Sequence, residues 1–161
     1  MSGSESDKTV PPMELAMALV KKIEGSKTRW LTVWNSKNQF WEIISTRKLE
    51  KESGIVALTR EVAWTLNLNG KKDFVISKMA LLHAFMSAGE SWNPFGRCVN
   101  LDFYTLEVYR KTVLAELERN QQIAWLSSES ICAGKTINHQ IVDPLFCRWN
   151  QKWKLIQPWV Q

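Results

Sequence analysis

The clearest pattern of apolar positions lies in the middle of the chain. Four apolar residues stand three or four positions apart and therefore share one helical face: Ile55, Leu58, Val62 and Leu66. Ser53 precedes them, and serine is favourable at a helix N-terminus because its hydroxyl accepts a hydrogen bond from a free backbone N–H. The pattern predicts a helix from Ser53 to about Asn67.

A second helical pattern lies near the start of the chain. Leu15, Leu19 and Ile23 are four residues apart, and a pair of prolines precedes them. Proline is tolerated in the first turn of a helix, where its missing N–H would have no helical partner. We therefore predict a helix over residues 13–23.

Residues that favour β-strands gather in the remaining segments. Residues 29–34 and 39–44 flank the turn-forming sequence Asn35-Ser-Lys-Asn38, and together they predict a hairpin. The charged stretch over residues 46–52 is predicted to be a loop. Further strands are predicted within residues 74–86 and over residues 99–109 and 123–127, with a short charged helix within residues 107–120 and a closing helix over residues 140–154.

This order of elements indicates an α/β layered domain. Strands and helices do not alternate regularly enough for a doubly wound sheet, and neither a Gly-x-Gly-x-x-Gly motif nor a P-loop is present in the sequence. A chain of 161 residues has the length of one domain. We place that domain at residues 11–161, behind a polar leader at residues 1–10 that is expected to be disordered.

The composition narrows the setting in which the protein is expected to act. No apolar run approaches the roughly 18 to 20 residues that cross a bilayer, so no membrane contact is expected. The first ten residues lack the apolar core of a secretory signal. The three cysteines are an odd number at wide spacing, which argues against a disulfide framework and a structural zinc site. We expect a cytoplasmic protein.

The net charge of +5 permits partners that carry phosphate. Lysine and arginine are nevertheless scattered along the chain in small groups, whereas nucleic-acid-binding domains usually concentrate them on one face. Nucleic acid is therefore not an expected partner. A nucleotide or another phosphorylated small molecule remains possible, as do a protein partner and a homodimer.

Residues 46–68 resemble the box of the Nudix hydrolases, which runs Gly-x5-Glu-x7-Arg-Glu-U-x-Glu-Glu-x-Gly-U, where U is aliphatic. Glu52 takes the position of the first glutamate. After seven intervening residues, Arg60-Glu61-Val62 takes the position of Arg-Glu-U, and Leu68 takes the last aliphatic position. Trp41 stands where the family often has an aromatic residue ahead of the box.

Two later segments extend the resemblance. Asp102-Phe-Tyr104 is similar to a later Nudix strand, and Trp125-Leu-Ser-Ser-Glu-Ser-Ile131 is similar to the family's Trp-Leu-x-x-Glu-x-Leu/Ile element. The three segments follow one another in the family's order. The resemblance implies an α/β/α sandwich in which a mixed β-sheet lies between helices.

The sequence departs from the Nudix box at four positions. Thr46 and Asn67 replace the two glycines, and Trp64 and Thr65 replace the two glutamates that follow Arg-Glu-U-x. In Nudix enzymes these helical glutamates hold Mg²⁺ or Mn²⁺ against the diphosphate of the substrate. Hard cations of this kind require several oxygen ligands, and a threonine hydroxyl is a poor substitute for a carboxylate. The resemblance therefore implies a degenerate metal site.

Several residues remain as candidates for chemistry. If the chain is active, the resemblance implies that Glu61, Glu52 and Arg60 are catalytic, with Glu61, Glu52 and Glu90 as ligands of Mg²⁺ or Mn²⁺. The alternative interpretation of Glu52, Arg60 and Glu61 is a structural ion-pair cluster, and a loop residue such as Glu90 is more often simply solvated. Without residual hydrolysis, no cofactor is expected.

Three residues are candidates for the lining of a ligand pocket: Trp41, Trp64 and Thr65. Our leading hypothesis is a Nudix-fold protein that binds a nucleotide, another phosphorylated ligand or a protein partner without efficient hydrolysis. The first alternative is an active hydrolase that cleaves a pyrophosphate bond in a nucleoside-diphosphate-linked substrate. The second alternative is a structural or regulatory interaction subunit.

Overall fold

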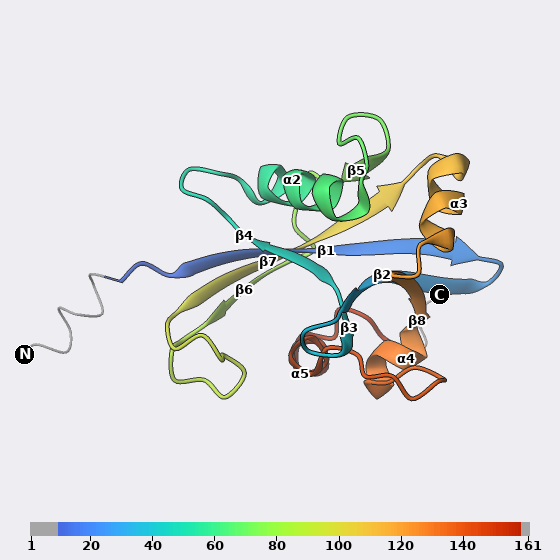
Figure 1. The fold of residues 1–161 in the computed structure, drawn as a ribbon. Coiled ribbons are helices and arrows are strands. Elements are labelled where there is room, and N and C mark those ends of the chain that lie inside the picture. Colours follow the sequence, from blue (N-terminus) through green and yellow to red (C-terminus); the bar gives the residue numbers. More distant parts are fainter. Residues whose placement is uncertain (1–9, 159–161) are drawn as a thin grey trace, which may run out of the picture.

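The structure, a computed structural model, describes residues 10–158 and consists of a β-sheet system between two layers of helices (Figure 1). Its elements are, in chain order, β1 (Met13–Glu24), β2 (Lys27–Asn35), β3 (Phe40–Glu42), β4 (Ile44–Arg47), α2 (Gly54–Leu66), β5 (Phe74–Ile76), β6 (Leu82–Met86), β7 (Val99–Val108), α3 (Lys111–Arg119), β8 (Ile123–Ser127), α4 (Ser128–Ala133) and α5 (Pro144–Trp153). The α/β class with a mixed sheet between helices is confirmed. The predicted leader lies outside the described residues, apart from Val10.

The prediction of a helix over residues 13–23 is wrong, because this segment is the central strand β1. It pairs in parallel with β7 and antiparallel with β2 and β4. Both faces of β1 are covered, so residues 16–20 are all buried and form a continuous apolar run rather than an alternating one. Such a run also contains the spacing of an amphipathic helix.

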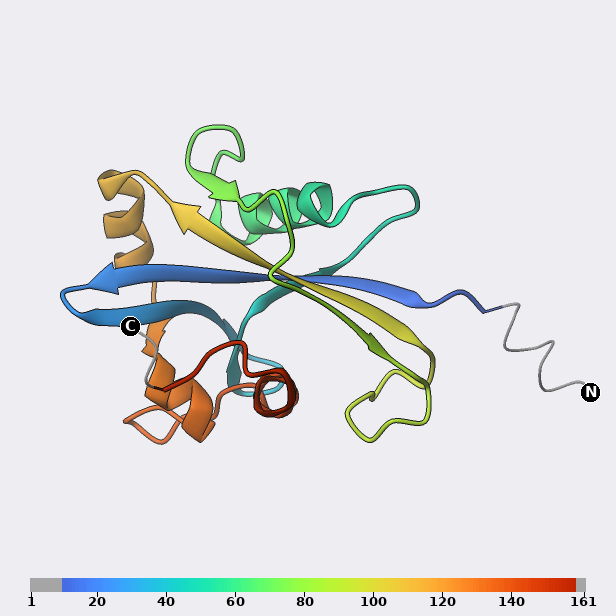
Figure 2. The same ribbon diagram turned by 180° about the vertical axis from the view of Figure 1, so that it is seen from behind.

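Alternate residues of β1 belong to two separate cores. Helix α2 lies on one side of the sheet, and α4 and α5 lie on the other (Figure 2). Ala16 and Ala18 pack in the core beneath α2 and α3. Met17 and Leu19 pack in the core beneath α4 and α5, with Phe146 of α5. This alternation fixes the register of the strand, since a slip by one residue would exchange the two cores.

The predicted helix after Ser53 is confirmed as α2, the helix that carries most of the candidate residues. The hydroxyl of Ser53 accepts a hydrogen bond from the backbone N–H of Val56 at 3.1 Å. Asn67 ends the helix in the left-handed conformation, with φ of 54°. The buried face of α2 comprises Gly54, Ala57, Leu58, Val62 and Leu66.

Most of the other predicted elements are present. β2 and β3 pair antiparallel as the predicted hairpin, and α5 corresponds to the closing helix with a later start. The short helix α4 was not predicted. Its first residue, Ser128, is buried, and its hydroxyl is satisfied by a hydrogen bond from the indole N–H of Trp30 at 2.9 Å. None of the helices in the described part of the chain is long and apolar enough to cross a membrane.

Candidate functional site

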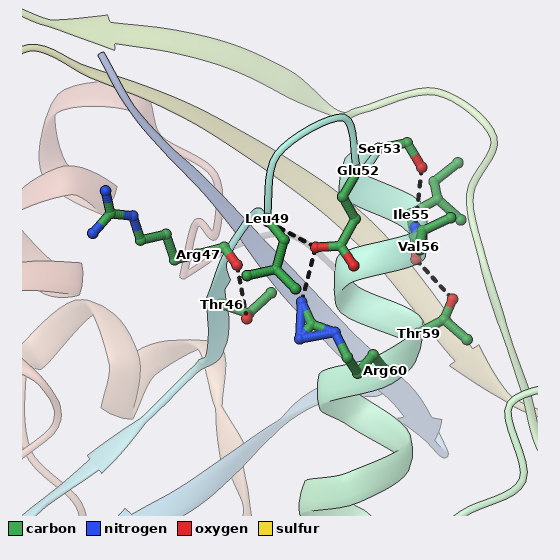
Figure 3. Close-up of polar contacts among 9 residues, drawn as sticks. All are labelled: Thr46, Arg47, Leu49, Glu52, Ser53, Ile55, Val56, Thr59 and Arg60. Atoms are coloured by element: carbon green, nitrogen blue, oxygen red, sulfur yellow. Dashed lines mark hydrogen bonds and ion pairs between the residues drawn. The ribbon is translucent and has the colours of Figure 1, made fainter. Parts of the chain in front are cut away.

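The loop that leads into α2 is held by the carboxylate of Glu52 (Figure 3). One oxygen of this carboxylate accepts hydrogen bonds from the backbone N–H of Leu49 and from the guanidinium of Arg60, each at 2.9 Å. The Glu52 side chain is only 11% exposed, whereas that of Arg60 is 43% exposed. The structure thus places Glu52 and Arg60 in an ion pair that ties the loop to the second turn of the helix.

Glu61 lies away from this ion pair, in a small pocket between α2 and the strands β2, β3 and β4. We call it the acidic pocket; its volume is about 60 Å³. Its lining residues are Val33, Glu42, Ile44, Ser45, Glu61 and Thr65. Glu61 and Thr65 are four residues apart and therefore neighbours on one face of α2. The lining thus includes two residues with carboxylates, Glu42 and Glu61, and two with hydroxyls, Ser45 and Thr65.

Glu42 is the residue of this pocket that the sequence did not single out. It ends β3, and one of its carboxylate oxygens accepts a hydrogen bond from the side-chain amide of Asn35 at 3.1 Å. Burial raises the pKa of the Glu42 carboxyl, and the charge of Asp143 raises it further, while the Asn35 hydrogen bond opposes the shift. One feature of the sequence could have identified Glu42: it is a glutamate within a predicted strand that is otherwise rich in apolar residues.

The two tryptophans proposed as pocket residues have opposite environments. Trp64 is 85% exposed and faces solvent. Since successive helical residues turn by about 100°, Trp64 lies on the solvent side of Glu61 and Thr65 lies on its core side. Trp41 is buried in the core beneath α5, and its indole N–H donates to the side-chain oxygen of Gln140 at 3.1 Å. The structure does not bring Trp41 into the acidic pocket.

Glu90 is also remote from Glu61. It lies in the loop between β6 and β7, which Figures 1 and 2 show on the side of the sheet opposite α2. Its carboxylate accepts a hydrogen bond from the backbone N–H of Ser87 at 2.6 Å and pairs with Lys152 of α5 at 3.2 Å. These interactions lower the pKa of the Glu90 carboxyl, the backbone hydrogen bond being the largest cause.

The donor set of the acidic pocket is poorer than the one that the resemblance to the Nudix box implies for a divalent cation. Mg²⁺ prefers six oxygen ligands in octahedral geometry, usually including carboxylates that are free to coordinate it. Here the neutral side chain of Thr65 follows Glu61 on the pocket face, and Asn35 already occupies one oxygen of Glu42. Within residues 10–158, no group of three or more His, Cys, Asp and Glu side chains is placed to hold a metal ion.

Solved structures of Nudix proteins share the architecture described above. The crystal structure of the C. elegans Ap4A hydrolase matches with a TM-score of 0.62 at 12% sequence identity, over 89% of this chain and 97% of that chain. The Nudix hydrolase RenU from M. smegmatis matches with a TM-score of 0.54 at 11% identity, over 88% of this chain and 83% of that chain. The E. coli dihydroneopterin triphosphate pyrophosphohydrolase matches with a TM-score of 0.51 at 11% identity, over 89% and 94%.

No protein-family model matches the sequence, and no curated protein matches it. The structural matches cover most of both chains, so the protein has the fold of the Nudix hydrolases. This confirms the fold that the sequence motifs implied. Sequence identities of this size establish the fold alone, so the activity has to be inferred from the residues of the site.

Proposed function

We propose that this chain is a Nudix-fold binding protein that does not hydrolyse diphosphates efficiently. The observation that carries the proposal is the residue set on the pocket face of α2. Glu61 is followed there by Thr65, while Trp64 faces solvent. With Trp64 and Thr65 in place of two glutamates, α2 offers a divalent cation only Glu61, and this reduced charge weakens the hold on the group that would position and activate water.

The acidic pocket also disfavours a phosphorylated ligand in the absence of a metal. Glu42 and Glu61 both line it, and like charges repel a phosphate at short range. The pocket volume of about 60 Å³ is far below the several hundred Å³ of typical small-molecule sites. A phosphorylated ligand of this protein would therefore bind elsewhere on the scaffold.

Turnover assays test the proposal directly. The full chain is incubated with Mg²⁺ or Mn²⁺ and with nucleoside di- and triphosphates, dinucleotides and sugar nucleotides. The expected result is product formation no faster than in the Glu61→Gln variant, because that variant keeps the shape of the pocket but removes a carboxylate. Robust turnover by the wild-type chain that disappears in Glu61→Gln would establish the active hydrolase instead, with Mg²⁺ or Mn²⁺ as its cofactor.

A protein partner or a homodimer is a second candidate function, and the exposed stripe along α2 favours it. Val56, Arg60 and Trp64 are four residues apart, so they follow one face of the helix. Val56 is 56% exposed and Trp64 is 85% exposed. Tryptophan and arginine are enriched among the residues that dominate protein interfaces. Light scattering on the wild-type chain and on Trp64→Ala tests whether this stripe supports self-association.

A further inference from the structure

A second and much larger pocket lies beside the loop that precedes α2, and we call it the basic pocket. Its volume is about 610 Å³. Three segments far apart in the chain form its walls: Pro11, Pro12 and Glu14 at the start of β1, Arg47–Glu52 at the end of β4 and in the loop before α2, and Arg97 in the loop before β7. The parallel pairing of β1 with β7 brings the first and third walls together, since Met13 donates its N–H to the carbonyl of Cys98 at 2.8 Å.

Four cationic side chains line this pocket: Arg47, Lys48, Lys51 and Arg97. Three carboxylates also line it, and two of them are already engaged. Glu52 is held by Arg60, as described above. Glu14 accepts a hydrogen bond from the amide of Asn100 at 3.0 Å and lies 4.0 Å from the ammonium of Lys48. The cations therefore retain more unused hydrogen-bond donors than the carboxylates can satisfy.

The two arginines of the basic pocket, Arg47 and Arg97, have few partners among the described residues. The Arg47 side chain points away from the Glu52–Arg60 pair (Figure 3), and no ion pair involves it among the described residues. Arg97 donates one guanidinium N–H to the carbonyl of Pro11, whereas its Nε is buried and finds no hydrogen-bond partner within residues 10–158. Because this Nε is buried, an anion in the pocket would meet the terminal N–H groups of Arg97, and no carboxylate pairs with them within residues 10–158.

We propose that the basic pocket binds a small molecule that carries a phosphate or diphosphate group. Guanidinium groups match the geometry of phosphate oxygens, and the lysines add further charge. Pro12 and the 62% exposed Leu49 offer apolar surface for the remainder of such a molecule. The pocket volume lies within the range of about 300 to 1,000 Å³ that is usual for small-molecule sites. The inference relies on the proposed function only in expecting that the bound molecule is left intact.

Isothermal titration of the full chain with ADP, in buffer containing EDTA, tests the site. Arg47→Gln combined with Lys51→Gln removes two exposed cations from the pocket without touching a buried contact. Since each cation can contribute a charge-assisted hydrogen bond, we expect the dissociation constant for ADP to rise by about tenfold or more. Adenosine, which lacks the phosphates, is expected to bind neither protein measurably.

The matched control is Lys71→Gln combined with Lys72→Gln, which changes the net charge equally in an exposed loop beyond the other end of α2. This variant is expected to retain the wild-type affinity within about twofold. Absence of saturable ADP binding by the wild-type chain at millimolar concentration would overturn the proposal, and so would equal losses in both double variants. Because the titration contains no divalent metal, its result does not depend on whether the chain has hydrolase activity.

Discussion

The acidic pocket and the basic pocket lie at opposite ends of α2 and differ in both charge and size. The acidic pocket holds about 60 Å³ between Glu42 and Glu61, whereas the basic pocket holds about 610 Å³ among four cations. The first contains Glu61, a metal ligand by the resemblance to the Nudix box, but Trp64 and Thr65 replace the two glutamates that the box places after it. The second has the charge and the volume for a phosphorylated molecule. The scaffold thus separates the place where hydrolysis would occur from the place that best accommodates an anion.

Both pockets depend on the same helix, so the largest effect is expected from loosening it. A Cβ atom added at Gly54 would lie 2.7 Å from the ring of Tyr104, a distance that Cβ contacts in proteins essentially never show. We expect Gly54→Ala to lower the free energy of unfolding by about 1–3 kcal/mol, because a packed ring must shift. Urea denaturation measures this change.

The control for this substitution is Gly89→Ala, where an added Cβ meets no atom within 4 Å. We expect its free energy of unfolding to change by less than about 1 kcal/mol, in the stabilising direction. Equal destabilisation by both variants would mean that α2 is not anchored through Gly54 and Tyr104.

The Glu52 carboxylate holds the loop that forms a wall of the basic pocket. Removing the Glu52 carboxylate frees both the Leu49 N–H and the Arg60 guanidinium. Because Arg60 is 43% exposed, we expect Glu52→Ala to cost only about 1 kcal/mol of stability. Glu116→Ala, which removes an exposed carboxylate of α3 outside the basic pocket, is the control, and urea denaturation of each variant gives the comparison.

The Glu42 carboxyl of the acidic pocket makes the stability of the protein depend on pH. Burial raises the pKa of Glu42, so the ionised form is less favourable in the folded chain than in the unfolded chain. Below the ordinary pKa of 4.5 the carboxyl is protonated in both states, and the free energy of unfolding is unaffected. As the pH rises through the pKa of the folded chain, the free energy of unfolding falls, and the loss is complete above that pKa. Glu42→Gln should therefore stabilise the protein at neutral pH, by less than about 1 kcal/mol, and the gain should vanish near pH 4.

Thermal unfolding across this pH range checks the prediction, with and without Mg²⁺. A metal bound between Glu42 and Glu61 would favour the ionised carboxylates. In that case Mg²⁺ would raise the melting temperature of the wild-type chain, and Glu42→Gln would be destabilising. We expect neither effect.

The smallest effect on folding is expected at Trp64. Its indole is 85% exposed, so Trp64→Ala should change the free energy of unfolding by no more than about 0.5 kcal/mol. Chemical denaturation gives this number. A much larger loss, at protein concentrations where the chain self-associates, would instead place Trp64 in a subunit interface.

The sequence predicted α2 because several local signals agreed there. The N-cap at Ser53, the apolar face and the stop at Asn67 all indicate the same element. The prediction for β1 was wrong, since a strand buried on both faces carries no alternation and two of its three partners, β4 and β7, are not its neighbours in the chain. Strand β7, which is also central, was predicted correctly because alternating polar residues such as Asp102 mark its course.

The site residues were predictable where the Nudix box itself carries them. Glu52, Arg60, Glu61 and Thr65 all lie on or beside α2, as their spacing required. The sequence could not show that Glu42 lines the acidic pocket or that Arg97 lines the basic pocket, because tertiary packing creates both pockets. Nor could it show that Glu90 lies across the sheet, paired with Lys152.

The most direct test of the central claim is paramagnetic broadening by Mn²⁺ in a two-dimensional NMR spectrum of the backbone amides. We predict that submillimolar Mn²⁺ produces no selective broadening of the amides from Glu61 to Thr65 in the wild-type chain. The double variant Trp64→Glu with Thr65→Glu restores two carboxylates beside Glu61, so these amides should broaden first in that protein. Selective broadening of the same amides in the wild-type chain would contradict the claim that its α2 lacks a metal site.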